Sequence, residues 1–244
     1  MRSRIGNRYN WIGMVRAFWV VTSPIEFLMA LGLHRVPATA TVRTPTGKVT
    51  LKLRNYESVK TIFGVFCRDD YATPASQPAF FLDIGANVGY ASVYFLTRNA
   101  ANRTRCYEPD ETNLECLREN LAPFADRTEI VNRAVTPTTG ETVIYRAPDG
   151  KHSALRPNEL ATLPQNIATR AFDEVLAEPT PPGLPVVLKL DVEGVEEELV
   201  KSVDFNTHPR LTRMLCESLF CSALIARPHS RDIRNGYVED LRFG

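Results

Sequence analysis

One stretch of eleven residues, Phe80 to Tyr90, constrains the fold of this chain more than any other segment. Its sequence is Phe-Phe-Leu-Asp-Ile-Gly-Ala-Asn-Val-Gly-Tyr: an apolar run typical of a buried strand, then an acid, then a loop of small residues. A helix-like stretch from Ala91 to Leu96 follows. Glycine lets the backbone turn tightly and lets a ligand come close to the chain, so this order of elements predicts a nucleotide-binding turn.

The spacing of the two glycines indicates which nucleotide this turn suits. A dinucleotide fingerprint has the form G-x-G-x-x-G and holds a pyrophosphate at the helix N-terminus. Here Asn87 stands where the second glycine of that fingerprint would be, and Asp83 places an acid at the strand end, which repels phosphate. S-adenosylmethionine carries an ammonium, a sulfonium and a ribose diol but no phosphate. We therefore expect S-adenosylmethionine as the cofactor, with an NAD(P)-dependent oxidoreductase or a buried turn without a ligand as the alternatives.

The composition is that of a globular enzyme, with 44% hydrophobic and 23% charged residues. A chain of 244 residues is long enough for one sizeable α/β core plus an appendage. The five cysteines are odd in number and include no C-x-x-C pair, which argues against a disulfide framework or a zinc site. We expect a reducing compartment, and hence a cytoplasmic protein. The cysteines are Cys67, Cys106, Cys116, Cys216 and Cys221.

The charge is distributed unevenly along the chain. Up to Tyr56 there are nine basic residues and a single acid, Glu26, a net charge of +8, whereas the remainder holds 20 basic and 27 acidic residues, a net of −7. Residues 1–38 are expected to form a basic, helical N-terminal arm. Its first part mixes arginines with large apolar residues in the pattern of an amphipathic helix: Trp11, Ile12, Val15, Phe18, Trp19 and Val20.

A second helix is expected from Pro24 to about Leu33, where Ser23 to Glu26 has the sequence of a capping box. Arg16, Pro24 and Glu26 interrupt the apolar run, so we expect neither a membrane span nor a signal peptide. Two interpretations of the arm stay open: it packs on the acidic surface of its own enzyme, or it makes peripheral contact with a membrane surface. We expect no nucleic acid as a partner.

Residues 39–78 are expected to form a β-hairpin, turning at Thr44-Pro45-Thr46-Gly47, and a lead-in segment. In residues 79–244, strands alternate with helices, which predicts a mostly parallel sheet covered on both faces, with its ligand crevice at the strand C-termini. The expected strands span residues 79–83, 103–108, 129–135, 186–191 and 211–217, with shorter candidates at 142–145, 153–156 and 237–242. The expected helices lie around residues 114–124, 173–177 and 195–203.

Acids end several of the expected strands. Asp83, Glu108, Asp191 and Glu217 each stand at a strand end, so all four are expected around the same crevice. A carboxylate at Glu108 can accept hydrogen bonds from both ribose hydroxyls, although NAD enzymes place a similar acid there. From its position alone, the turn at Asn132, Arg133 and Ala134 is expected to flank the adenine. The alternative for Glu108 is a surface acid before a helix.

A second dense motif, Leu188-Lys-Leu-Asp-Val-Glu-Gly194, lies at the end of the fourth expected strand. Alternation along a strand puts Lys189 and Asp191 on one face, where the lysine could hold an acceptor hydroxyl while a carboxylate accepts its proton. We take Lys189, Asp191, Glu193 and Glu217 as candidate catalytic residues. The carboxylates could also offer oxygen ligands to Mg²⁺, although nothing in the sequence demands a metal.

Other acids and bases near this motif have simpler explanations. The three consecutive glutamates Glu196 to Glu198 are explained by the helix dipole, which favours acids in a first turn. The same explanation competes with a functional role for Glu193. The four histidines do not cluster in the sequence, and His152 is the only one that we consider as a base.

These motifs resemble the FkbM family of S-adenosylmethionine-dependent methyltransferases. The resemblance rests on residues 81–90, on Tyr107-Glu-Pro109 with Asn113 behind it, and on residues 188–194, and it extends from about Thr41 onward. It implies a class I methyltransferase fold, Rossmann-like, with a seven-stranded sheet ending in an antiparallel strand. It also implies O-methylation of a sugar, a lipid-linked glycan or another natural product. Within it, the methionine end of the cofactor is expected at Asp83, Gly85, Asn87 and Gly89, and the ribose at Glu108. Asp191 and Glu193 would face the acceptor, and Ala86 and Asp191 are also counted among the cofactor-binding residues.

The sequence departs from this family pattern near its end. Between Glu217 and Gly244 we expect room for only one strand where the family fold has two. The last strand would then be absent, or supplied by the N-terminal hairpin. This departure keeps open a third possibility, a non-catalytic module that binds the cofactor without turnover.

Overall fold

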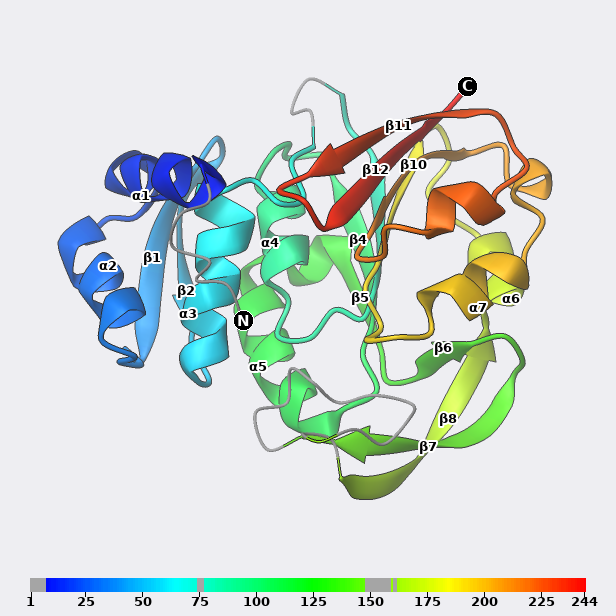
Figure 1. The fold of residues 1–244 in the computed structure, drawn as a ribbon, viewed down its shortest axis with the longest axis horizontal. Helices are drawn as coiled ribbons and strands as arrows, with labels where there is room; N and C mark the ends of the chain where they lie inside the picture. Colours follow the sequence, from blue (N-terminus) through cyan, green and yellow to red (C-terminus); the bar gives the residue numbers. More distant parts are fainter. Residues whose placement is uncertain (1–7, 74–76, 148–158, 160–161) are drawn as a thin grey trace.

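A computed structural model describes residues 8–73, 77–147, 159 and 162–244 of the chain. The central sheet is built from β3 (Phe80–Ile84), β4 (Arg103–Tyr107), β5 (Thr128–Val131), β9 (Val186–Leu190), β10 (Leu211–Cys216), β11 (His229–Arg234) and β12 (Val238–Phe243). Its seven strands lie in the order β11-β12-β10-β9-β3-β4-β5 (Figure 1). Within this described part, β12 alone runs antiparallel to its neighbours. The expected α/β, mostly parallel sheet with one antiparallel strand is confirmed.

The expectation of a missing last strand is wrong. Both β11 and β12 follow Glu217, and they form a hairpin whose turn places Asn235 and Gly236 at φ values of 51° and 82°. The sequence obscured β11 because its residues are polar and largely exposed, with Ile233 as their one apolar side chain. Charged side chains are common on such an edge strand, because they keep its unpaired edge from pairing with another chain. The N-terminal hairpin forms a separate sheet and supplies no strand.

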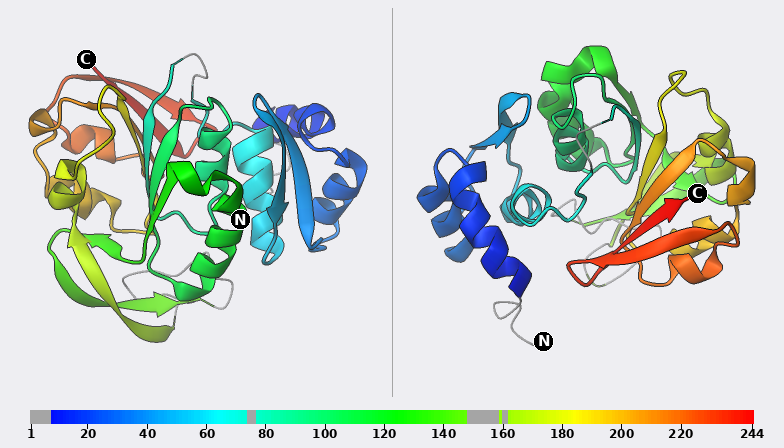
Figure 2. Two further views of the ribbon diagram at one scale, coloured as in Figure 1. Left: turned by 180° about the vertical axis from the view of Figure 1, so that it is seen from behind. Right: turned by 90° about the horizontal axis from the view of Figure 1, so that it is seen from above.

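Helices cover both faces of the central sheet (Figures 1 and 2). On one face lie α4 (Tyr90–Leu96) and α5 (Glu111–Leu121), and on the other α6 (Phe172–Ala177) and α7 (Glu196–Lys201). Because side chains alternate along a strand, β3 contributes to two cores. Phe81 stacks on Phe95 of α4 with ring centroids 4.6 Å apart, whereas Leu82 joins the opposite cluster with Phe172 and Leu199. Short 3₁₀ segments in the described residues complete the layers: η3 (Ala122–Arg127), η4 (Phe205–Thr207) and η5 (Cys221–Leu224).

The N-terminal residues pack against the face covered by α4 and α5. They form α1 (Arg8–Val20), α2 (Pro24–Gly32), the hairpin of β1 (Thr39–Thr44) and β2 (Gly47–Lys52), α3 (Tyr56–Ile62) and the π-helical turn η2 (Phe63–Cys67). The two expected helices and the expected hairpin are confirmed. The capping box is wrong: the Ser23 side chain makes no cap hydrogen bond. The backbone just before it is held by the hairpin instead, through the Val21–Val42 bridge.

A second, three-stranded sheet interrupts the expected third strand. The strand predicted over residues 129–135 is two strands, β5 and β6 (Ala134–Thr136), separated at Asn132 and Arg133. In this sheet β6 pairs with β8 (Leu163–Ala171), which also pairs with β7 (Gly140–Arg146). β8 was not predicted, whereas β7 contains the short strand predicted at residues 142–145. The strand expected at residues 153–156 lies outside the described residues.

Candidate active site

The loop after β3 lies where the sequence predicted a ligand-binding turn. Gly85 and Ala86 donate their backbone N–H groups to the carbonyl oxygen of Tyr107 at 3.1 and 3.0 Å, which ties the loop to the end of β4. Gly85 and Asn87 are partly exposed, whereas Ala86, Val88 and Gly89 are buried. The part of this loop that a ligand can reach is therefore made by Gly85 and Asn87.

Glycine is required at both loop positions for contacts within the protein. Gly85 has a φ of +79°, and a Cβ added there would lie 1.8 Å from the carbonyl oxygen of Asp191. Gly89 has a φ of +87°, and its Cβ would lie 2.6 Å from Cδ1 of Leu117 on α5. These close approaches bring the end of β3 against the end of β9 and seat the start of α4 on α5. The absence of a side chain at Gly85 and Gly89 therefore allows the close backbone and helix contacts that shape the crevice.

Glu108, at the end of β4, is held as a buried acceptor with only 5% exposure. Its Oε1 accepts from the backbone N–H of Asp110 at 2.9 Å and from Nδ2 of Asn113 at 3.2 Å, and its Oε2 accepts from the backbone N–H of Asn87 at 2.7 Å. Burial raises the pKa of Glu108 to about 7, against the lowering effect of these donors. Each carboxylate oxygen has two acceptor positions, so Oε2 retains one that no described residue fills. This geometry fits a ribose hydroxyl donor.

Asp83 lies beneath the crevice. Its carboxylate is fully buried, accepts from the Ser92 hydroxyl at 2.7 Å and lies 3.2 Å from Nζ of Lys189. Burial raises the pKa of Asp83, and Lys189 and Ser92 oppose that rise. The side chain expected at the methionine end of the cofactor thus contacts Lys189 within the protein.

Lys189 is the centre of a charged network at the end of β9. Its Nζ donates to the Gly85 carbonyl oxygen at 2.8 Å and lies 3.2 Å from an oxygen of both Asp83 and Asp191. Burial by itself lowers the pKa of Lys189, but the surrounding carboxylates of Asp191, Asp83 and Glu217 outweigh burial and raise it. The raised pKa keeps Lys189 in its cationic form, in which its Nζ is a hydrogen-bond donor. Its place on the same face as Asp191 agrees with the strand alternation that predicted it.

Tyr71 joins this network, although its sequence context did not single it out. Its hydroxyl lies 2.7 Å from Oε1 of Glu217 and 3.3 Å from Oδ2 of Asp191, so its one proton can be donated to either carboxylate. Burial, followed by these two carboxylates, raises the pKa of Tyr71 well above its usual value. Tyr71 lies in the segment between η2 and β3, where no periodicity or motif marks it.

A hollow of about 590 Å³ opens beside this network, within the usual range for small-molecule sites. Six acids and a single cation, Lys201, are among its lining residues; the acids are Asp191, Glu193, Glu196, Glu197, Glu198 and Glu217. Glu193 is exposed, with a φ of 58°. Glu196 is buried and accepts from the backbone N–H groups of Val192 and Gly194 at 2.9 and 3.0 Å, so it holds the loop after β9.

The three residues expected at the adenine, Asn132 to Ala134, follow Val131 of β5, whose carbonyl oxygen accepts from the backbone N–H of Glu108 at 3.2 Å. Arg133 is exposed in the turn between β5 and β6, and Ala134 is buried against Ile144 and Ile167 of the second sheet. His152 lies outside the described residues. Among the residues the structure describes, no group of three His, Cys, Asp or Glu side chains is arranged to hold a metal ion. The magnesium site considered at Asp191, Glu193 and Glu217 is accordingly not supported.

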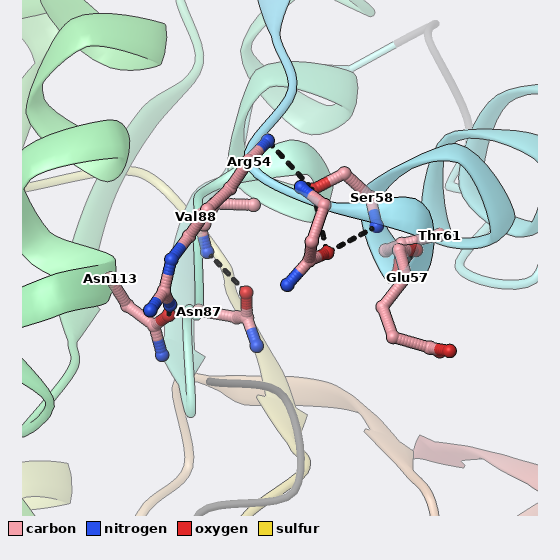
Figure 3. A pocket seen from close by; sticks show the side chains of 8 residues that line it. Arg54, Glu57, Ser58, Thr61, Asn87, Val88 and Asn113 are labelled. Atoms are coloured by element: carbon pink, nitrogen blue, oxygen red, sulfur yellow. Dashed lines mark hydrogen bonds between the residues drawn. The ribbon is translucent and has the colours of Figure 1, made fainter. Parts of the chain in front are cut away.

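Residues from the N-terminal segment reach the cofactor side of the crevice (Figure 3). A niche of about 10 Å³, room for a single water, lies between Asn87 and Val88 of the loop, Asn113 of α5, and Arg54 with the start of α3. A guanidinium nitrogen of Arg54 donates to Oδ1 of Asn113, whose amide nitrogen donates to Glu108. The residues before β3 therefore form one wall of this part of the crevice.

Comparison with known families shows the family of this chain. The family model described as the methyltransferase FkbM domain matches residues 83–219, which is more than half of the chain. The chain belongs to the FkbM methyltransferase family. The matched range holds both dense motifs, the loop after β3 and the end of β9. Membership implies S-adenosylmethionine as the cofactor, and the acceptor position left on Glu108 fits its ribose.

Solved structures of methyltransferases are similar to this FkbM chain at low identity. A methyltransferase FkbM from Methylobacillus flagellatus KT is 13% identical, with a TM-score of 0.48, over 90% of this chain and 58% of that chain. A methyltransferase from Geobacter sulfurreducens is 13% identical, with a TM-score of 0.42, over 68% of this chain and 72% of that one. The chain thus spans less than two thirds of the length of the first of these. No curated protein sequence matches the chain.

Proposed function

We propose that this protein transfers a methyl group from S-adenosylmethionine to a hydroxyl of a sugar, a lipid-linked glycan or another natural product. The observation that carries the proposal is the network of Lys189, Asp191, Tyr71 and Glu217 beside an open hollow, at the strand ends next to the loop after β3. Family membership supplies the cofactor class. The cofactor, when bound, supplies an electrophilic methyl group on a sulfonium.

The residues suited to hold the cofactor are Glu108, Gly85 and Asn87. Glu108 offers a carboxylate to the ribose hydroxyls, and the partly exposed backbone of Gly85 and Asn87 lines the crevice toward Asp191. Asp83 acts from beneath by holding Lys189. The acidic lining next to the crevice attracts a cation, which agrees with a ligand that carries a sulfonium and an ammonium.

The acceptor hydroxyl would be oriented and deprotonated by the carboxylates. Asp191 lies 3.2 Å from Nζ of Lys189 and lines the hollow, where its carboxylate can accept a proton from the acceptor. Tyr71 lies between Asp191 and Glu217 and donates its one hydroxyl proton to one of the two carboxylates. The acidic lining of the hollow disfavours phosphates and carboxylates and favours neutral polyols or cations as acceptors.

The test is methyl transfer from labelled S-adenosylmethionine to a panel of neutral hydroxylated acceptors. We expect an ether-linked methyl group, and we expect Asp191→Asn to abolish transfer while cofactor binding persists. Glu141→Gln, at an exposed position on β7, is the control that should leave transfer unchanged. Methylation of nitrogen or of a carboxylate would contradict the proposal. Cofactor binding without turnover would favour the non-catalytic module, and binding of NADH would favour an oxidoreductase.

A further inference from the structure

Helix α1 contacts the rest of the protein through its small residues. Gly13 and Ala17 are buried on the side that faces η2. The contact is close: a Cβ added to Gly13 would lie 2.7 Å from Cζ of Phe63 and 2.8 Å from Cγ of Arg68. Arg16 adds an ion pair with Asp69 on the same side. The helix is therefore firmly seated, and its orientation is fixed by contacts that need small side chains.

The large apolar residues of α1 point the other way. Trp11, Ile12, Val15, Phe18 and Trp19 are 60, 51, 54, 52 and 68% exposed. At 3.6 residues per turn these five positions fall within an arc of about 120°. Helix α2 adds the exposed apolar residues Ile25 and Met29, and Leu33 follows directly after it. We call these eight residues the arm surface.

This arrangement is the reverse of an ordinary surface helix, which buries its large apolar side chains and exposes its small or polar ones. Monomeric soluble proteins seldom expose so many large apolar side chains along one face of a helix without a partner. The interpretation in which the arm only packs on its own enzyme explains Gly13 and Ala17 but not the arm surface. A partner is needed for the outward face.

We propose that the arm surface binds the face of an anionic lipid bilayer, with α1 lying in the plane of the interface. The charge of the segment favours this partner: residues 1–56 hold nine basic residues and one acid. Arg2, Arg4 and Arg8 precede the apolar residues of α1, and Arg35 is exposed beside Leu33. Apolar and aromatic residues on one face with arginines nearby are the signature of an interfacial helix.

Two alternatives to interfacial membrane binding fit the arm surface less well: a second copy of this chain, and a helix that crosses the membrane. A second copy of this chain would bring two segments of net charge +8 together, and like charges repel across an interface. A transmembrane mode does not fit α1, because 13 residues span about 20 Å and the hydrocarbon core is about 30 Å thick. No described helix is long and apolar enough to cross a membrane. Binding in the plane of the interface needs no such length.

The chain carries its own probe for this test. Its two tryptophans are Trp11 and Trp19, both on the arm surface, so intrinsic tryptophan emission reports on this surface alone. Mixed phosphatidylcholine–phosphatidylserine vesicles should shift the emission to shorter wavelength and should sediment the protein. Pure phosphatidylcholine vesicles should do so more weakly, and added salt should weaken binding to the anionic vesicles.

The matched variant is Ile12→Ser combined with Val15→Ser and Phe18→Ser, which keeps both tryptophans. We expect at least about tenfold weaker binding to the anionic vesicles, with unchanged far-ultraviolet circular dichroism, because these side chains are largely exposed. Leu163→Ser, at an exposed apolar position on β8, should leave vesicle binding unchanged.

Two results would overturn the proposal. One is the absence of both the emission shift and sedimentation with anionic vesicles. The other is a dimeric mass in solution together with an emission shift that depends on protein concentration without lipid, which would assign the arm surface to a second copy of the chain.

Discussion

Glu108 makes binding of the adenosine group dependent on pH near neutrality. Burial raises the pKa of this carboxyl to about 7, from an ordinary value of 4.5. A ribose hydroxyl donates its hydrogen bond to the ionised carboxylate, so affinity should rise as the pH rises through 7. At pH 8 about 91% of the group is ionised and at pH 6 about 9%, which gives about tenfold weaker binding at pH 6, or about 1.4 kcal/mol.

The ligand for this assay is 5′-methylthioadenosine, which has the ribose diol but no amino acid group that titrates. Isothermal titration at pH 6, 7 and 8 measures its dissociation constant for the wild type and two variants. Glu108→Gln should bind about 10- to 100-fold more weakly at pH 8, because a charged acceptor is lost, and should show no pH dependence. Glu115→Gln, at an exposed position on α5, should keep the wild-type profile.

The same shift acts on folding with the opposite sign. A carboxyl whose pKa is raised in the folded state contributes stability that is complete below pH 4.5 and is lost as the pH rises through 7. Between pH 6 and 8 the ligand-free protein should therefore lose stability at the Glu108 site while ligand affinity increases.

Equal wild-type affinity for 5′-methylthioadenosine at pH 6 and 8 would refute the binding prediction. A tenfold pH effect that survives in Glu108→Gln would refute it as well.

Three further predictions follow from the crevice. Gly85→Ala should destabilise the fold by several kcal/mol in urea unfolding, because its Cβ would overlap the Asp191 carbonyl oxygen, whereas Gly183→Ala, with open space around it, should cost about 1 kcal/mol. Lys189→Met should cost about 3–5 kcal/mol at neutral pH and less in acid, because Asp83 is left buried without a counter-charge; equal losses at both pH values would contradict this. Tyr71→Phe should lower kcat without changing cofactor affinity, because the hydrogen bond to Asp191 or Glu217 is lost. An unchanged kcat would contradict a contribution of Tyr71 to turnover.

The loop after β3 and the strand ends could be predicted from the sequence because one local pattern carries them. An apolar run, an acid and two glycines lie within a few residues of each other, and the turn needs nothing from the rest of the chain. The same holds for Lys189 and Asp191, whose common face follows from strand alternation. The position of Glu108 at the end of β4 follows from the order of strands and helices.

Features that depend on distant contacts could not be predicted in this way. The edge strand β11 has no apolar face, and its place is set by pairing with β12. The break at Asn132 and Arg133 depends on β8, which draws β6 into a second sheet. Tyr71 enters the site only because the segment before β3 folds over the ends of β9 and β10.

The sequence grouped Asp83 with Asp191 and Glu217 at strand ends and explained Glu196 by the helix dipole, whereas the structure divides these acids differently. Asp83 and Glu196 are both buried and hold neighbouring groups: Lys189 in one case, the backbone of the loop after β9 in the other. Asp191 and Glu217 keep contact with the hollow. Position at a strand end places a carboxylate near the crevice, but its rotamer and partners decide whether it faces a ligand.

The most direct test of this account is a crystal structure of the protein with S-adenosylhomocysteine. We predict that the ribose hydroxyls donate to Glu108, and that the homocysteine group lies along Gly85 toward Asp191 and the acidic hollow. A ligand bound with its ribose away from Glu108, or with its sulfur directed away from Asp191 and Glu217, would contradict the account.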